Sequence, residues 1–179
     1  MIHMHLATAL FVIFAVWKWG DWRNWQKYHT TILFYSLGNL AYNFLTANYF
    51  LWRFNAEILV NHTIAEMVYT FVVFPGTIIL FLGNYPTERP RIILHHFKWI
   101  TIYGVWEWVF TLFGKIEYQY GWTLGWSVAF LVIMFPLLAL HHRRPLLVYF
   151  LSAIVAVLVL WYFEVPVHIP IEYRNPDIP

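Results

Sequence analysis

The chain contains no cysteine, and charged residues make up only 11% of it. The absence of cysteine excludes disulfide bonds, thiolate catalysis and Cys-ligated zinc or iron–sulfur sites. The scarcity of charge sets the chain apart from ordinary soluble domains, in which about a quarter of the residues are charged. With a formal net charge of +2 and no basic block, the sequence also argues against nucleic acid as a partner.

Apolar residues make up 61% of the chain and gather into six long stretches. A helix of about 20 such residues crosses a hydrocarbon core of ~30 Å. We therefore predict an all-α fold, a polytopic transmembrane helix bundle of about six spans, formed as one unit by residues 1–163. The first span is short and could instead lie in the membrane interface. The predicted spans run from about Ile2 to Trp17, Thr30 to Trp52, Ala65 to Gly83, Phe97 to Gly114, Trp122 to Leu140, and Leu146 to Phe163. Residues 164–179 are predicted to form an extended, exposed, Pro-rich tail.

The basic residues are divided unevenly between the loops on the two sides of these spans. Because Lys and Arg stay in cytoplasmic loops, this distribution predicts that both termini face outward. Eight of the eleven follow spans one, three and five: Lys18, Arg23, Lys27, Arg89, Arg91, Lys98, Arg143 and Arg144. The other three, Arg53, Lys115 and Arg174, lie on the opposite side.

Glu107 lies near the middle of the fourth predicted span, between two tryptophans. An ionised carboxylate at that depth costs ~3 kcal/mol on insertion scales, so we expect it to be protonated, paired or facing water. Helical spacing places Tyr103 and Thr111 near the same face. This polar seam could bind a ligand or carry protons, or it could simply hold a neighbouring helix.

A second polar stripe follows the second predicted span. Ser36, Asn39, Asn43 and Thr46 are spaced by three and four residues and therefore share one helical face. Uncharged amides can orient a ligand or hydrogen-bond an acid, and interhelical packing is the simpler role. We expect this face to meet Glu107 across the bundle.

Histidines supply further candidates for polar chemistry. His62 and Glu66 are spaced i, i+4 at the outer end of the third span. The two side chains could form a proton entry, half of a metal site, or a helix-terminal ion pair. Five others, at the predicted cytoplasmic boundary, are weak candidates for metal or haem ligation if the helix ends converge, and otherwise contact lipid phosphates. These five are His29, His95, His96, His141 and His142. No cofactor is predicted from them.

Two segments carry a resemblance to a known family: TFVVFPGTIILFLGNYP at residues 70–86 and YGVWEW at residues 103–108. They resemble a family of small multi-spanning membrane proteins of endospore-forming Gram-positive bacteria, and the likeness covers most of the spans. No activity is established for that family. The resemblance therefore implies a bacterial cytoplasmic or spore membrane and nothing about catalysis.

Three functions compete on this evidence. The first is a non-enzymatic bundle that binds a small apolar or amphipathic ligand, or a protein partner, through the intramembrane polar seam. The second is a proton-coupled transporter or channel in which Glu107 titrates. The third is a haem- or metal-binding membrane protein that uses the boundary histidines. The sequence favours the first, with the lipid bilayer as surroundings and a homo-oligomer or a membrane protein as a possible partner.

Overall fold

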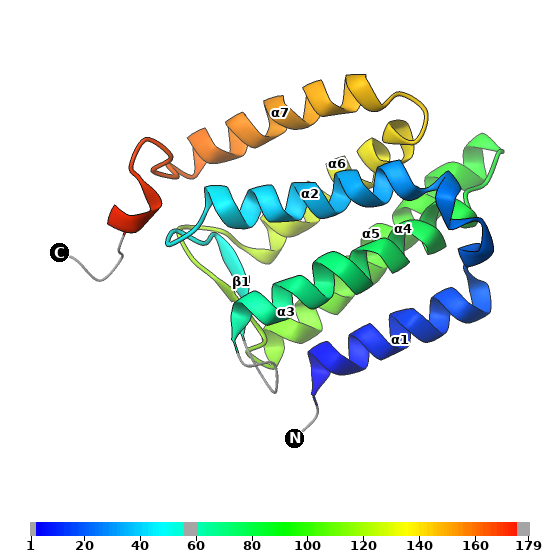
Figure 1. The fold of residues 1–179 in the computed structure, drawn as a ribbon, viewed down its shortest axis with the longest axis horizontal. Coiled ribbons are helices and arrows are strands. Elements are labelled where there is room, and N and C mark those ends of the chain that lie inside the picture. The colour runs from blue at the N-terminus through cyan, green and yellow to red at the C-terminus, as the bar shows by residue number, and fades with distance from the viewer. Residues whose placement is uncertain (1–2, 56–60, 175–179) are drawn as a thin grey trace.

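The computed structural model describes residues 3–55 and 61–174, and most of this part of the chain is helical. Successive helices run in opposite directions along one long axis, with a two-stranded sheet at one end (Figure 1). We call this the strand end and the opposite end the basic end, because Arg23, Arg89 and Arg143 lie there. In chain order the elements are α1 (Met4–Trp19), η1 (Trp22–Lys27), α2 (His29–Leu45), β1 (Trp52–Phe54), α3 (His62–Val68), the π-helical η2 (Tyr69–Val73), α4 (Phe74–Gly83), α5 (Arg89–Leu112), β2 (Ile116–Tyr118), α6 (Leu124–His141), α7 (Pro145–Tyr162) and η3 (Ile171–Tyr173).

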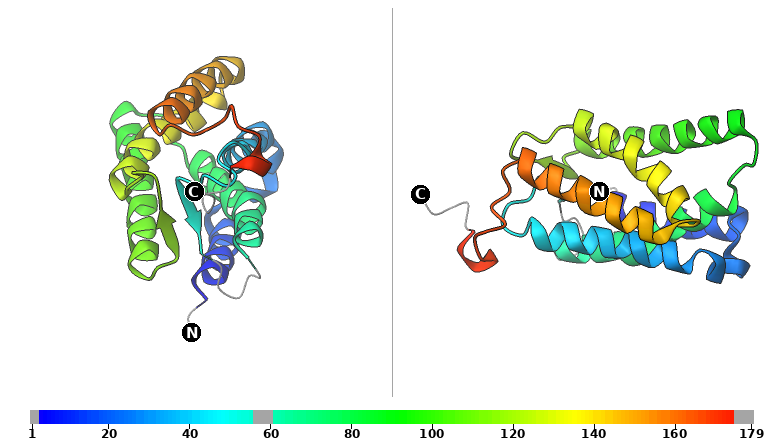
Figure 2. Two further views of the ribbon diagram at one scale, coloured as in Figure 1. Left: turned by 90° about the vertical axis from the view of Figure 1, so that its left-hand side faces the viewer. Right: turned by 90° about the horizontal axis from the view of Figure 1, so that it is seen from above.

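The helices form two halves (Figure 2). In the N-terminal half, α1 and α2 both pack against the continuous rod of α3, η2 and α4. In the C-terminal half, α6 packs between α5 and α7. The strands join the halves, because β1 pairs antiparallel with β2 in the register Trp52↔Tyr118 and Phe54↔Ile116.

Three helical stretches are long and apolar enough to cross a membrane. They are His62–Gly83, Leu124–His141 and Pro145–Tyr162, and α1 is a shorter apolar helix. The prediction of a helical fold is thus confirmed in its main part, and the third, fifth and sixth predicted spans match these stretches to within three residues. The small sheet was not predicted.

The second predicted span is too long. Its helix ends at Leu45, and Thr46 caps it through a hydrogen bond from Oγ1 to the Tyr42 carbonyl at 2.7 Å. The chain then turns through Asn48, whose φ of 60° is left-handed. The Tyr42 hydroxyl bonds both the N–H and the C=O of Trp52 at 2.9 Å. The apolar run therefore continues as a packed turn and a strand instead of as helix.

The fourth predicted span begins too late, because α5 already starts at Arg89. Pro90 lies in the first turn, where its fixed φ suits a helix and its missing N–H is not needed. Glu88 and Arg91 form an ion pair of 3.2 Å across this start. Arg89, Arg91 and Lys98 are therefore residues of a helix and not of a loop.

The tail predicted to be extended and exposed is partly folded onto the bundle. Val165 is buried, and Arg174 donates from Nη1 to the Leu45 carbonyl at 2.7 Å and from Nε to the Ile169 carbonyl at 2.6 Å. A guanidinium at the C-terminus of α2 satisfies a free carbonyl and suits the negative end of the helix dipole. The remainder of the tail, 175–179, and Ile2, where the first span was predicted to begin, lie outside the described residues.

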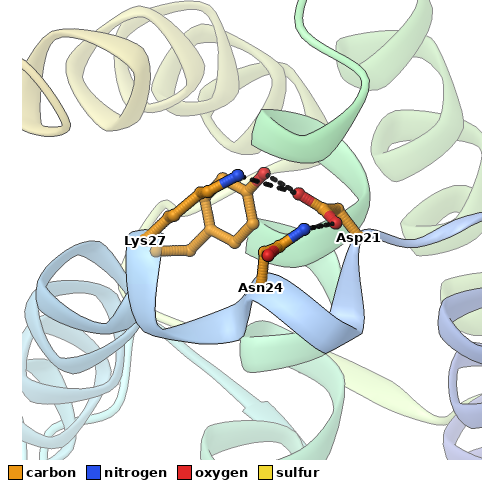
Figure 3. A network of polar contacts seen from close by, with 4 residues as sticks. Asp21, Asn24 and Lys27 are labelled. Carbon is orange, nitrogen blue, oxygen red and sulfur yellow. Dashed lines mark hydrogen bonds and ion pairs between the residues drawn. The ribbon is translucent and has the colours of Figure 1, made fainter.

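The turn between α1 and α2 is fixed by one carboxylate (Figure 3). Asp21 accepts hydrogen bonds from the Tyr28 hydroxyl at 2.7 Å and from Asn24 Nδ2 at 2.6 Å, and Lys27 Nζ lies 4.0 Å away. Burial and the bond to Asp21 raise the pKa of Tyr28 to about 12, so the phenol keeps its proton. The same bond, together with Asn24 and the Lys27 charge, lowers the pKa of Asp21.

Helices α1 and α4 cross closely at Gly76. A Cβ atom at this position would overlap the side chain of Val12 on α1, whereas a Cβ at Gly38 on α2 would meet nothing within 4 Å. Gly76 therefore sets the distance between two helices that carry much of the wall of the cavity described next.

Candidate functional site

A cavity of about 610 Å³ lies between the two halves, which is within the range of small-molecule sites. Its wall is built mainly from apolar and aromatic side chains of α1, the α3–α4 rod, α5 and α6. Representative members are Val12, Ala15, Phe74, Leu80, Trp99, Trp106, Trp122, Phe130, Leu131 and Met134. Because α1 and α5 belong to different halves, the cavity exists only where the halves meet.

Glu107 lines the cavity near the strand end. Its Oε1 accepts a hydrogen bond of 2.7 Å from the hydroxyl of Tyr118 on β2. Burial and this bond to Glu107 raise the pKa of Tyr118 to about 12, so the phenol remains a donor. The pairing of the strands thus places a fixed hydrogen-bond donor on the carboxyl group.

Two further groups complete the polar surroundings of Glu107. Ser127 of α6 is buried, accepts from Trp122 Nε1 at 2.9 Å and lies within hydrogen-bonding reach of the carboxyl. Thr111, one turn along α5, bonds back to the Glu107 carbonyl at 2.7 Å and lies 3.4 Å from the Tyr118 hydroxyl. The structure therefore brings Glu107 and Thr111 together at one position.

Tyr103 lines the same wall one turn toward the basic end. Its hydroxyl is 2.6 Å from Thr77 Oγ1, and the Thr77 hydroxyl also donates to the Val73 carbonyl at 2.9 Å. Near the strand end, Trp106 Nε1 donates to Thr8 Oγ1 at 3.2 Å. These bonds connect α5 to α4 and to α1 across the cavity.

The expected meeting of the second-helix stripe with Glu107 is wrong. Asn39 and Asn43 donate instead to Glu66 Oε2, at 3.2 and 3.3 Å, and Asn39 also donates to Thr70 Oγ1 at 2.9 Å. Glu66 is only 5% exposed. The reason is packing, because α2 lies mainly against the α3–α4 rod.

The remaining stripe residues have local roles. Ser36 donates to the Thr70 carbonyl at 2.9 Å, next to the π-helical segment, and Thr46 caps α2. In a π-helical turn the carbonyl of residue i accepts from the N–H of residue i+5, so the Thr70 carbonyl would accept from the N–H of residue 75. Proline at that position has none. The stripe residues thus have three different partners: the buried Glu66, the Thr70 carbonyl that lacks a backbone donor, and the C-terminal end of α2.

His62 and Glu66 do not act as a pair. Glu66 points to the amides of α2, whereas the ring of His62 packs edge-on against Phe50 at 5.4 Å. The ion pairs of the described residues are Lys27–Asp21, Arg53–Glu117 and Arg91–Glu88, which do not include either residue. The spacing of four residues is consistent with one face, but Glu66 is turned toward α2.

The boundary histidines separate into different environments. His141 is buried, stacks on Phe34 at 4.1 Å and bonds Thr31 Oγ1 at 3.1 Å. His95 and His96 turn toward the end of α4, where Nε2 of His95 bonds the Phe81 carbonyl at 3.0 Å and Nε2 of His96 lies 2.9 Å from the Tyr85 hydroxyl.

The other two boundary histidines are exposed, His29 beside Trp25 and His142 beside Tyr28. Within the described ranges, no group of three or more His, Asp or Glu side chains is arranged to hold a metal ion.

Sequence reasoning missed several groups that shape the site. Tyr118 lies in a connection predicted only as a loop, Trp122 lies at the predicted start of the fifth span, and no local signal links either residue to Glu107. Ser127 did carry a signal, as a lone hydroxyl within an apolar run. His5 was also missed: it is fully buried, with Nε2 2.9 Å from the Asn55 carbonyl and Nδ1 3.1 Å from the Tyr69 hydroxyl.

Comparison of the chain with known protein families, with curated proteins and with solved structures gives no match.

Proposed function

We propose that this chain is a non-enzymatic integral membrane protein that binds a small apolar or amphipathic molecule in the cavity between its two halves. The observation that carries the proposal is a cavity of about 610 Å³ whose apolar wall contains one hydrogen-bonded carboxyl group, Glu107. Binding sites for small molecules combine apolar walls with a few placed polar groups.

Membrane insertion is the second part of the proposal. Three helical stretches have the length and composition to span a bilayer, and α1, α2 and α5 run alongside them. Large apolar side chains cover the outer surface, for example Leu146 (83% exposed) and Trp161 (76% exposed) on α7. A surface of this kind suits acyl chains and not water. We therefore propose six passes, with both termini outside.

The resemblance of residues 70–86 and 103–108 supports a bacterial cytoplasmic or spore membrane as the location. The basic end, which carries Arg23, Arg89 and Arg143, then faces the cytoplasm. The bilayer is the immediate partner, and the proposal assigns the chain no nucleic acid and no cofactor.

A cavity-filling variant tests the binding function. Ala15 of α1 is buried and lines the cavity, so Ala15→Leu places three extra carbons in it. Ala7→Leu makes the same change on an exposed position of the same helix, outside the cavity lining. The protein in nanodiscs is titrated with the neutral apolar probe N-phenyl-1-naphthylamine, and energy transfer from tryptophan is measured against empty nanodiscs.

We expect saturable energy transfer in the wild type and in Ala7→Leu. In Ala15→Leu the affinity should fall on the order of tenfold, because the probe and the new side chain compete for the same volume. Equal titrations for all three proteins would place the probe in the lipid and contradict the proposal.

A further inference from the structure

The cavity opens sideways between the two halves. Phe11 on α1 and Ile102 on α5 both line it, yet they are 63% and 45% exposed. Both lie in the middle part of their helices and not at an end of the bundle. In a membrane this opening faces the acyl chains, so the molecules that reach the cavity are those dissolved in the bilayer.

Glu107 is the sole acid among the described residues of the cavity wall, and Lys98 is the sole lysine or arginine. They lie nine residues apart on α5, which is about 14 Å along a helix. None of the ion pairs of the described residues includes Glu107. Its carboxyl accepts a hydrogen bond from the neutral Tyr118 and lies within reach of the neutral Ser127.

Two tryptophans share the cavity wall with this acid. Trp106 precedes it on α5 and donates its indole N–H to Thr8, and Trp122 donates its indole N–H to Ser127. Trp106 is also held in a stack on Phe110 with ring centroids 3.9 Å apart. Both rings line the cavity, and aromatic rings attract organic cations.

Lys98 suggests the opposite kind of ligand, an anionic amphiphile with its head at the basic end. Lys98 is exposed, however, and the long side chain of a lysine can extend to lipid phosphates at the membrane interface. Glu107 is half-buried and accepts a hydrogen bond from the Tyr118 hydroxyl. The burial and the aromatic surroundings favour the acid as the group that selects the ligand.

We infer, on the premise that the cavity binds a small molecule, that its ligand is a lipophilic organic cation, an amine or quaternary ammonium on an apolar body. The ligand enters from the bilayer between α1 and α5, places its ammonium group at Glu107 between Trp106 and Trp122, and fills the remaining apolar volume with its body.

Three amphiphiles that share one alkyl chain test the inference: decyltrimethylammonium, decanol and decanoate. Each competes with N-phenyl-1-naphthylamine for the wild-type protein in nanodiscs made from uncharged lipid, which removes attraction by the bilayer surface. The same competition is measured for Glu107→Gln and for Glu117→Gln, a matched change of an exposed glutamate on β2. We expect the cation to bind on the order of tenfold more tightly than the alcohol in the wild type and in Glu117→Gln. In Glu107→Gln this preference should disappear.

Each other result overturns the inference in a recognisable way. Equal binding of cation and alcohol would show that the cavity binds small molecules without selecting charge. The proposed function would then hold, and the inference about the ligand's charge would be wrong. A preference for decanoate would assign the head group to Lys98. A preference for the cation that persists in Glu107→Gln would assign it to another group. No competition by any of the three, together with no saturable probe binding, would overturn the proposed function as well.

A second measurement needs no variant and therefore does not depend on how Glu107→Gln folds. A decylammonium probe with a diazirine next to the nitrogen is crosslinked to the wild-type protein, and the modified peptides are identified by mass spectrometry. Modification concentrated at residues 106–107 and 122–127 is expected, with protection by excess decyltrimethylammonium. Modification concentrated around Lys98 and Trp99 would overturn the placement.

Discussion

The hydroxyl of Ser36 donates a 2.9 Å hydrogen bond to the backbone carbonyl of Thr70, on the neighbouring helical rod. Pro75, five residues after Thr70, leaves that carbonyl without its backbone donor. A side chain of α2 thus repairs a helix that a proline interrupts, a device that membrane helices need because no water is at hand.

Removal of this donor should destabilise the protein. Ser36→Ala leaves a buried carbonyl without a partner, which costs about 1–3 kcal/mol. Ser152→Ala on α7, a half-buried position of the same residue type, should change stability by less than about 0.5 kcal/mol. Thermal unfolding in detergent, followed by circular dichroism, compares the two, and equal midpoints would refute the role given to Ser36.

The close approach of α1 and α4 predicts a strong response at Gly76. A Cβ there overlaps Val12, so Gly76→Ala should lower the unfolding midpoint, with a cost of about 1–3 kcal/mol. Gly38→Ala has open space and a better helix propensity, so it should be neutral or stabilising by up to about 1 kcal/mol. A Gly76→Ala protein that unfolds at or above the wild-type temperature would contradict this packing.

The strand pair predicts how stability responds to acid. Hydrogen bonds from Asn55 and Arg53, with the charge of Arg53, hold the pKa of Glu117 below its ordinary value of 4.5. Its ion pair with Arg53 has an N–O distance of 2.9 Å. A depressed pKa means that the contribution to stability is present above pH 4.5 and is lost as the pH falls below that value.

Thermal-unfolding midpoints of the wild type and Glu117→Gln, measured between about pH 3 and pH 6, test this pH dependence of stability. The wild type should lose its advantage over Glu117→Gln as the pH falls through the lower part of this range. Because 44% of the Glu117 side chain is exposed, solvent screens the pair and the difference should be small. A gap between the two proteins that is constant with pH would show that the ion pair does not matter.

The binding function predicts that no proton flux accompanies it. Glu107 accepts from Tyr118, and Glu66 lies in a separate cluster with Asn39 and Asn43, so these hydrogen bonds of the described residues do not join the two acids. Reconstituted vesicles should therefore dissipate a pH gradient no faster than empty ones. Flux that vanishes in Glu107→Gln, with the fold intact, would instead favour the transporter.

The orientation in the membrane is open to a direct measurement, because the chain has no cysteine. In intact cells, a membrane-impermeant maleimide should label Lys115→Cys, at the strand end. It should label Arg91→Cys and Arg143→Cys only after permeabilisation. Strong labelling of position 91 or 143 in intact cells would reverse the assigned orientation.

Sequence reasoning found the helices whose limits are set locally. The helices that end at Gly83, begin after Thr123 and begin at Pro145 have their limits marked by glycine, a capping hydroxyl and proline. It failed at residues 46–52, because Leu51 is buried, and its apolar neighbours partly buried, by a turn and a strand that pairs with residues more than sixty positions away.

The same distinction applies to the site. Glu107 is conspicuous in one dimension, as a charge within an apolar run, and it does line the cavity. Its partners are not conspicuous, because Tyr118 reaches it only through the pairing of β2 with β1. The amides of Asn39 and Asn43 were recognised as a face, but which acid they meet depends on the order in which the helices pack.

The cavity lies at the junction of two halves that only residues 84–88 connect along the chain. A molecule that fills it touches both halves, so the free energy of binding is at the same time a free energy of adhesion between them. On the proposed function, the ligand would in this sense be a structural component: as its concentration in the bilayer rises, separation of the two halves would require more free energy. The protein's lifetime in the membrane would then follow the supply of the compound it binds.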